Sequence, residues 1–184
     1  LSPAEISRRA AARPPATRLR VPRVEDDSDV VEFVDRVYGA QCEALAAECG
    51  DFLIRRSDGI FAYQLAVVVD DAAMGITEVV RGNDLLSSTP RQMYLQNLLG
   101  YPHPRYAHVP LLVAADGRRL SKRDHDCSMD ELRERFGSPE ALLGYIAHLA
   151  GIAPDAEPRS ATELVELFSW DAIRAHRDDI VIAS

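Results

Sequence analysis

Cysteine is scarce in this sequence. Its three cysteines, Cys42, Cys49 and Cys127, include no CxxC pair and no even set that could all be joined. This number excludes the disulfide framework of a small secreted domain. We therefore expect free thiols in a reducing compartment, the cytoplasm.

Long apolar runs are also missing. Although 47% of the 184 residues are hydrophobic, no run approaches the roughly 18 apolar residues that a membrane-spanning helix requires. We expect a soluble chain with a real core, one domain or two small ones, and no membrane partner. The sequence begins at Leu1 without an initiator Met, a charged n-region or a signal-like h-region, which indicates a piece of something longer.

Positive charge is outnumbered by negative charge. The 29 Asp and Glu residues against 21 Lys and Arg residues give a net charge of −8, which argues against a general nucleic-acid binder. The cations gather in two groups. These are Arg8, Arg9, Arg13, Arg18, Arg20 and Arg23, and then Arg118, Arg119, Lys122 and Arg123. For the first group we expect a solvated surface.

Proline and glycine mark the elements of the first third. Ser2, Pro3 and Glu5 are typical of the start of a capped helix, and later prolines require extended chain. The alanine-rich segment 37–49 favours a helix that ends at Gly50. Segment 52–63 predicts a hairpin with its turn at 57–59.

The middle of the chain contains one ambiguous segment. Five consecutive apolar residues at 65–69 fit a buried strand or a buried helix, and their β-branched content favours a strand. Residues 76–80 are a clearer strand. Thr89 as N-cap, Pro90 at the first helical position and Gln92 as the capping-box partner predict a helix over 90–99 that ends before Gly100.

The remaining third is predicted to be a hairpin followed by helices. Residues 108–115 favour a strand, an Asp116-Gly117 turn follows, and residues 118–121 form a short return strand, which leaves Lys122 on the loop beyond. Capping signals predict three helix starts and two helix ends. The starts are at Ser128 with Glu131, Ser138 with Pro139 and Ser160 with Glu163, and the ends are at Gly137 and Gly151.

Two features could bind anions, and Tyr63 is a third residue of interest. Cations at 118–123 beyond a tight turn suit a triphosphate, although the residues alone favour a solvated charge run. Arg81 ends an apolar strand before Gly82, which suits bidentate capture of a carboxylate; a salt bridge to Asp84 or Asp70 is the alternative. Tyr63 alone is more typical of a half-buried packing residue with a wet hydroxyl.

A known family is matched by three stretches in order: VVVDDAAMGITEVVRGNDLLSSTPRQMYLQNLLGY, HVPLL and GRRLSKR. They resemble the second half of the catalytic domain of class I glutamyl-tRNA synthetases over roughly residues 50–150, and RLSKR is similar to the family's KMSKS-type signature. The resemblance is closer to the glutamyl-queuosine tRNA(Asp) synthetases, truncated paralogues that attach glutamate to the queuosine base of tRNA(Asp). Glu78 and Leu85 stand where a full synthetase more usually has His, and positions 124–184 leave no room for helical anticodon-binding domains.

The resemblance implies roles for particular residues. It implies that Tyr63 and Arg81 bind glutamate, that Leu120, Ser121 and Lys122 contact ATP, and that Lys122 is catalytic. It further implies ATP as a substrate with Mg²⁺, tRNA(Asp) bearing queuosine as partner, and adenylation followed by transfer. The resemblance also implies a helix over 65–74, whereas the β-branched residues at 65–69 favour a strand.

Two features of the family are missing from the sequence. The five histidines include no HxGH pair, so the HIGH-type motif is absent, and so is the zinc-binding stretch. Cys42 and Cys49 are better explained as buried free thiols than as metal ligands. We therefore expect a C-terminal portion that needs the N-terminal half of the same enzyme and is inactive alone.

Two other functions stay open: a fragment of an ordinary glutamyl-tRNA synthetase, and a non-catalytic tRNA-binding module descended from a synthetase. The expected fold is α/β, the second half of a class I synthetase Rossmann-type catalytic domain followed by a small helical C-terminal region. We expect 1–50 to be the remnant of an inserted, connective region and 51–124 to carry the nucleotide-binding part with the KMSKS-type loop. Residues 125–184 would be the helical region.

Overall fold

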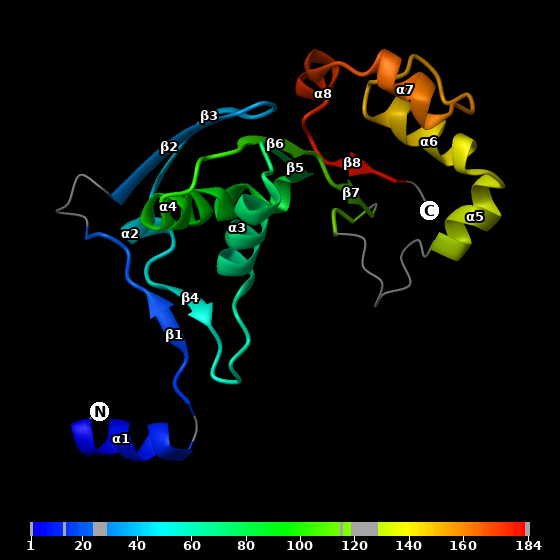
Figure 1. Ribbon diagram of the computed structural model, residues 1–184. Coiled ribbons are helices and arrows are strands. Elements are labelled where there is room, and N and C mark those ends of the chain that lie inside the picture. Colours follow the sequence, from blue (N-terminus) through cyan, green and yellow to red (C-terminus); the bar gives the residue numbers. More distant parts are fainter. Residues whose placement is uncertain (1, 13, 24–28, 115, 119–128, 183–184) are drawn as a thin grey trace. The chain divides into compact units, whose positions relative to one another are not determined.

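The protein is an α/β chain, seen here in a computed structural model that describes residues 2–12, 14–23, 29–114, 116–118 and 129–182 (Figure 1). Its strands are β1 (Thr17–Leu19), β2 (Val30–Asp35), β3 (Gly39–Ala44), β4 (Phe52–Arg55), β5 (Glu78–Gly82), β6 (Arg105–Val109), β7 (Leu112–Val113) and β8 (Ile180–Val181). Its helices are α1 (Pro3–Ala12), α2 (Leu45–Glu48), α3 (Tyr63–Met74), α4 (Thr89–Leu99), α5 (Met129–Phe136), α6 (Pro139–Leu149), α7 (Ala161–Leu167) and α8 (Trp170–Ala175), with a 3₁₀ helix at Asn83–Ser88. None of the described helices is long and apolar enough to cross a membrane.

The central sheet has four strands in the order β3-β2-β6-β5. Strands β2 and β6 are parallel, with Asp35 opposite Tyr106, and such parallel neighbours require a long crossover between them. Two smaller sheets pair β1 with β4 antiparallel and β7 with β8 parallel. The carboxyl end of β5 leads directly into the 3₁₀ helix, so Arg81 lies close to the end of a strand.

The chain divides into two compact units. The first comprises residues 1–35, 40–79 and 85–106, and the second comprises 36–39, 80–84 and 107–184. In the first unit α3 and α4 pack side by side (Figure 1), over a core in which Leu45, Val68 and Leu95 are buried. The division into three segments at residues 50 and 124 stays a prediction.

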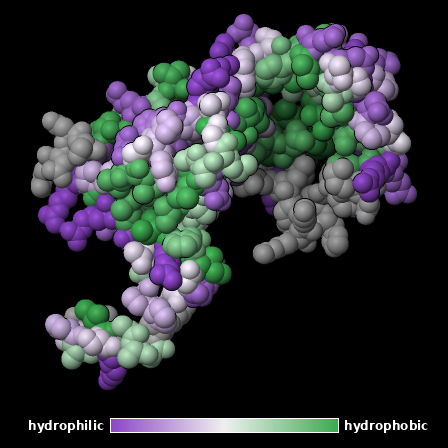
Figure 2. All heavy atoms as spheres, viewed as in Figure 1, coloured by the Kyte–Doolittle hydropathy of each residue, from purple (hydrophilic) through white to green (hydrophobic). Residues whose placement is uncertain are grey.

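The second unit has its own smaller core. Val37, Ala150 and Ile173 are its buried members, and Trp170 and Ile180 pack against them. In Figure 2 hydrophobic residues gather beneath the C-terminal helices. Helix α6 packs on both α5 and α7 in this unit.

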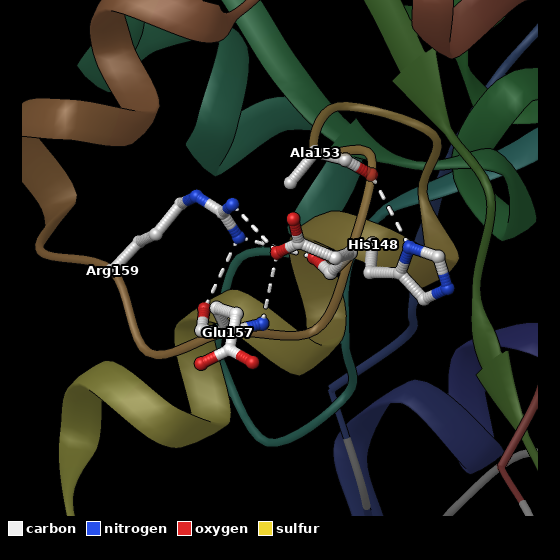
Figure 3. A network of polar contacts seen from close by, with 5 residues as sticks. His148, Ala153, Glu157 and Arg159 are labelled. Atoms are coloured by element: carbon white, nitrogen blue, oxygen red, sulfur yellow. Dashed lines mark hydrogen bonds and ion pairs between the residues drawn. The ribbon is translucent and has the colours of Figure 1, made fainter.

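A polar network closes the loop between α6 and α7 (Figure 3). Arg159 donates from Nη1 to the carbonyl oxygens of Asp155 and Glu157, both at 3.1 Å, and from Nη2 to Asp155 Oδ1 at 2.6 Å. His148 Nδ1 lies 3.2 Å from the carbonyl oxygen of Ala153. One side chain thus satisfies two backbone carbonyls and neutralises a carboxylate, which holds a loop of about ten residues in one conformation.

Most helix ends predicted from local signals are confirmed. The backbone N–H of Glu5 donates to Ser2 Oγ, and Ser160 with Glu163 forms a complete capping box at the start of α7. Ser138 Oγ accepts from the backbone N–H of Ala141, and α4 ends at Gly100, whose φ is +70°. These interactions involve residues three or four positions apart, so the sequence alone can specify them. The start at Ser128 lies outside the described residues.

Three predictions of secondary structure are wrong. Segment 37–49 is strand β3 followed by one short helix, because the chain reverses at Gly39 (φ +74°) and β3 joins the sheet beside β2. Residues 65–69 belong to helix α3, so the strand favoured by their β-branched content is wrong and the helix implied by the resemblance is confirmed. The N-cap of α4 is Ser88 rather than Thr89, since the 3₁₀ helix runs into α4 and leaves Ser88 in a helical conformation.

The predicted capping box at α4 does not form, and its expected partner makes a different contact. Gln92, the expected capping partner, is buried and instead donates from Nε2 to Gln64 Oε1 of α3 at 2.8 Å. Gln64 Nε2 in turn donates to Ser88 Oγ at 3.0 Å. These bonds tie α3 to the start of α4.

Candidate substrate-binding site

Arg81 lies at the end of β5, where it is half-buried. Its Nε donates a hydrogen bond to Nε2 of His108, on the adjacent strand β6, at 3.0 Å. His108 is fully buried, with an exposed fraction of 0%. An imidazole nitrogen that accepts this bond carries no proton, so the neutral ring has its proton on Nδ1.

The backbone beyond Arg81 is tightly packed. A Cβ added to Gly82 would lie 2.5 Å from Asp84 Oδ1 and 2.7 Å from Leu111 Cδ2, so any larger residue would force these side chains to move. Both contacts are with the ends of flexible side chains, so a substitution here would displace Asp84 and Leu111 rather than the backbone. The φ of Gly82 is not in the left-handed region.

Asn83, the residue after Gly82, is held by hydrogen bonds from its side chain. Its Nδ2 donates to Tyr38 OH at 3.0 Å and to Asp179 Oδ1 at 2.7 Å, and Asp179 Oδ1 also accepts from the backbone N–H of Leu111 at 3.0 Å. The hydroxyl of Tyr38 donates to the carbonyl oxygen of Arg177 at 2.7 Å. Residues 81–83 are thus held by contacts from β6, from the turn after β2 and from the segment before β8, all within the second unit.

Tyr63 is the first residue of α3, directly after the hairpin whose turn at 57–59 the sequence predicted. Its exposed fraction is 52%, so it is more exposed than a packing role would require. Tyr63 belongs to the first unit and Arg81 to the second. Their convergence on one glutamate stays a prediction.

Leu120, Ser121 and Lys122 lie outside the described residues. The tight turn before them is confirmed: Gly117 has a φ of +77°, and the backbone N–H of Ala114 donates to the carbonyl oxygen of Arg118 at 2.9 Å. The backbone N–H of Arg118 also donates to Asp116 Oδ1, and this bond lowers the pKa of Asp116. Most of the return strand predicted at 118–121 lies outside the described residues, so it stays a prediction.

The two described cysteines differ in exposure. Cys42 is exposed on β3 and Cys49 is half-buried after α2, so the expectation that both thiols are buried is wrong for Cys42. Burial raises the pKa of Cys49. Among the described residues there is no group of three His, Cys, Asp or Glu side chains placed to hold a metal ion.

Sequence reasoning missed His108, Asn83 and Asp179. His108 is a lone histidine in the apolar stretch HVPLL, one strand away from a predicted ligand-binding arginine. A buried histidine in such a strand needs a polar partner. The position of His108 in an apolar strand was therefore the sequence signal that could have pointed to a contact with a polar side chain. Asn83 and Asp179 are 96 positions apart, and no local pattern connects them.

A family model describes this chain over nearly its whole length. The model for class I tRNA synthetases (E and Q), catalytic domain, matches residues 2–176.

Three curated relatives share a name. A Glutamyl-Q tRNA(Asp) synthetase of Nitratidesulfovibrio vulgaris is 53% identical over 159 residues, which cover 85% of this chain and 47% of that protein. Proteins of the same name from Geobacter sulfurreducens and Symbiobacterium thermophilum are 51% and 42% identical, over 81% and 96% of this chain and 48% and 52% of their own lengths. The chain spans about half the length of these relatives.

Solved structures share the fold at low identity. A glutamate tRNA ligase from Elizabethkingia meningosepticum, in complex with its amino acid, superposes with a TM-score of 0.70 at 23% identity, covering 98% of this chain and 39% of that one. Glutamate-tRNA synthetase from Elizabethkingia anophelis gives a TM-score of 0.72 at 22% identity, over 100% of this chain and 40% of that one. The expected α/β class I fold is thereby confirmed. With the family match over residues 2–176, the chain belongs to the class I tRNA synthetase (E and Q) catalytic-domain family.

Proposed function

We propose that this chain is part of an enzyme that activates glutamate with ATP and transfers it to the queuosine base of tRNA(Asp). Support comes from relatives of that name at 42–53% identity and from Glu78 and Leu85, which resemble the paralogue rather than a full glutamyl-tRNA synthetase. A cytoplasmic location fits a tRNA substrate. The observation that carries the proposal is the half-buried Arg81 at a strand end, oriented by a buried histidine.

The proposed reaction has two steps. A carboxylate oxygen of glutamate attacks the α-phosphorus of ATP, the bond to the bridging oxygen breaks, and pyrophosphate leaves with that electron pair. The product is glutamyl-adenylate, a mixed anhydride. A hydroxyl oxygen of the modified base then attacks the acyl carbon, AMP leaves, and the hydroxyl proton is lost. No covalent enzyme intermediate is needed, so catalysis consists of positioning and electrostatic stabilisation.

Each proposed residue has a separate task. The Arg81 guanidinium would pair with a carboxylate of glutamate, because its planar fork matches a carboxylate in geometry and charge. Tyr63, half-exposed at the start of α3, would offer its hydroxyl to the same substrate. Lys122, with Leu120 and Ser121, would stabilise the charge that builds up on the phosphates. Mg²⁺ would bind chiefly to the phosphates of ATP, where it offsets their charge.

The transfer step can be tested with three tRNA substrates. The full-length protein that contains this chain should attach radiolabelled glutamate to tRNA(Asp) bearing queuosine. It should leave unmodified tRNA(Asp) and tRNA(Glu) uncharged. Charging of tRNA(Glu) would instead assign an ordinary glutamyl-tRNA synthetase, and glutamate-independent tRNA binding without charging would assign a non-catalytic module.

A further inference from the structure

The N-terminal segment concentrates positive charge in an otherwise acidic chain. Residues 1–23 contain six arginines and one acidic residue, Glu5, which gives a net charge of +5. Because the whole chain carries −8, the other 161 residues carry −13. The carboxylate of Glu5 accepts hydrogen bonds from the backbone N–H and the hydroxyl of Ser2 at the start of α1. So uneven a distribution indicates an anionic partner for this segment rather than for the whole chain.

Part of this charge is held in a fixed position on β1 and directly after it. Leu19 packs against the core of the first unit and Val21 is buried. Arg18 and Arg20, which alternate with them, are exposed. Pairing of β1 with β4 holds the extended chain in place (Figure 1). Residues two apart in such a chain lie about 6.5 Å from each other, close to the spacing of successive phosphates along a nucleic-acid strand.

The arginine pair, Arg18 and Arg20, is anchored at three points. Arg18 Nη1 donates to the carbonyl oxygen of Asp51 at 2.9 Å, and the backbone N–H of Val21 donates to Asp51 Oδ1 at 3.1 Å. The hydroxyl of Tyr94 donates to the carbonyl oxygen of Arg20 at 3.4 Å. A surface that is ordered before its partner arrives loses little conformational freedom on binding, and such preorganisation increases affinity.

A hollow of about 500 Å³ adjoins the arginine pair. Its charged lining residues are Arg20, Arg23 and Asp51, so two cations meet one carboxylate. That carboxylate already accepts the hydrogen bond from the backbone N–H of Val21. The lining is mainly polar, unlike the mainly apolar pockets that bind small molecules, and it fits a solvated anion.

We propose that the arginine pair and the adjoining hollow form a phosphate-contact surface for RNA, namely for the backbone of the tRNA substrate. The inference rests on the proposed function in taking the RNA to be a tRNA. A sugar–phosphate backbone matches the pair in charge and in repeat, and a guanidinium can bind phosphate through two hydrogen bonds. Arg8 and Arg9 of α1, both exposed, add to the attraction at longer range. In the free protein these arginines form the solvated surface expected from the sequence.

The test measures binding of a fluorescent, unmodified tRNA(Asp) to the full-length protein that contains this chain, by anisotropy at about 50 to 200 mM salt. Arg20→Gln should weaken binding roughly fivefold at about 0.1 M salt, because one phosphate contact fewer releases fewer counterions. The slope of log K against log salt should become shallower by about 0.7–0.9. Arg20→Lys keeps the charge and should retain the wild-type slope.

Three controls accompany this measurement. Arg56→Gln removes an exposed arginine whose charge is already offset by Asp58 at 2.7 Å, and it should leave affinity and slope unchanged. With tRNA(Glu) as probe, Arg20→Gln should cause the same loss, because phosphate contacts carry no sequence information. Binding to vesicles of phosphatidylserine and phosphatidylcholine is measured in parallel and should be weak in every variant.

Each outcome separates the inference from its alternatives. Equal affinity and salt slope in the wild type and in Arg20→Gln would overturn the inference, as would a slope that Arg20→Lys lowers equally. An effect of Arg20→Gln on vesicle binding alone would overturn it in favour of a membrane surface. A wild-type protein that binds tRNA in the expected way but does not charge it would instead overturn the proposed function and leave the RNA surface in place.

Discussion

Glu43 on β3 illustrates how one residue can reduce the stability of this fold. Its Oε1 is buried and has no hydrogen-bond partner among the described residues, as is true of Arg91 Nε. Burial raises the pKa of Glu43, although the positive charge of Arg91 opposes that change. A raised pKa means that the folded state binds the proton more tightly than the unfolded state, so stability falls as the pH rises and the side chain ionises.

Glu43→Gln should therefore stabilise the protein at neutral pH. The expected gain is modest, roughly 1–2 °C in melting temperature, because the attraction to Arg91 is lost together with the desolvation penalty. The gain should vanish below the ordinary glutamate value of 4.5, where Glu43 is protonated in both states. The matched control is Glu166→Gln, an exposed carboxylate on α7. A lower melting temperature for Glu43→Gln at pH 7 would show that the pairing with Arg91 outweighs desolvation.

Single residues were predictable only in part. Arg81 at a strand end followed from an apolar run and a glycine, both local features of the sequence. His108 could not be connected to it, because their contact depends on which strands are neighbours in the sheet. The exposure of Cys42 was missed for a related reason, since a helix was expected where the chain forms a strand.

At the scale of elements, the loop between α6 and α7 depends on Arg159. The side chain is largely buried, with 17% exposed, and it serves two carbonyl oxygens and one carboxylate. Its hydrogen bond is the main cause that lowers the pKa of Asp155, with a second contribution from the backbone N–H of Glu157. A lowered carboxyl pKa means stabilisation that is present above the ordinary value and is lost as the pH falls through the folded value.

Arg159→Ala should lower the melting temperature by roughly 2–4 °C at pH 7, because two loop carbonyl groups and the Asp155 carboxylate lose their shared donor. The difference in melting temperature between Arg159→Ala and the wild type should become smaller below pH 3.8, the ordinary pKa of an aspartate, as the Asp155 carboxylate becomes neutral. Arg177→Ala is the control, since that side chain is exposed. Differential scanning calorimetry at a series of pH values measures the melting temperatures of the wild type and of Arg159→Ala. A difference between them that stays constant down to pH 2 would contradict the assigned role of the ion pair.

Elements defined by local signals could be predicted, and elements defined by partners could not. The capping boxes at Ser2 and Ser160 involve side chains three residues apart, and the structure confirms them. Strand β3 depends on pairing with β2, which overrides the helical preference of its alanines. The sequence does contain a helix-end signal for α3, Gly75, which adopts a φ of +67° at the C-cap. The apolar run before it fits a buried strand as well as a buried helix, so the run alone could not decide between them.

At the scale of the whole molecule, the chain spans about half the length of its curated relatives. We expect the 184-residue chain alone to show no ATP–pyrophosphate exchange, because the HIGH-type motif is not in its sequence. If the proposed function holds, adding a polypeptide that supplies the HIGH-type motif should restore the exchange. Robust exchange by the 184-residue chain would contradict the expectation that it lacks part of the phosphate-binding site.

The central claim is that Arg81 binds the glutamate carboxylate. It is tested most directly by glutamate-dependent ATP–pyrophosphate exchange in the full-length protein carrying Arg81→Ala. This variant should lose roughly 100-fold or more in kcat/KM for glutamate. It should stay folded, with a melting temperature roughly a few degrees lower, because Nε2 of the buried His108 loses its donor. Arg105→Ala, which removes an exposed arginine paired with Glu78, should exchange normally. Exchange by Arg81→Ala at the wild-type rate and with the wild-type KM for glutamate would contradict the claim.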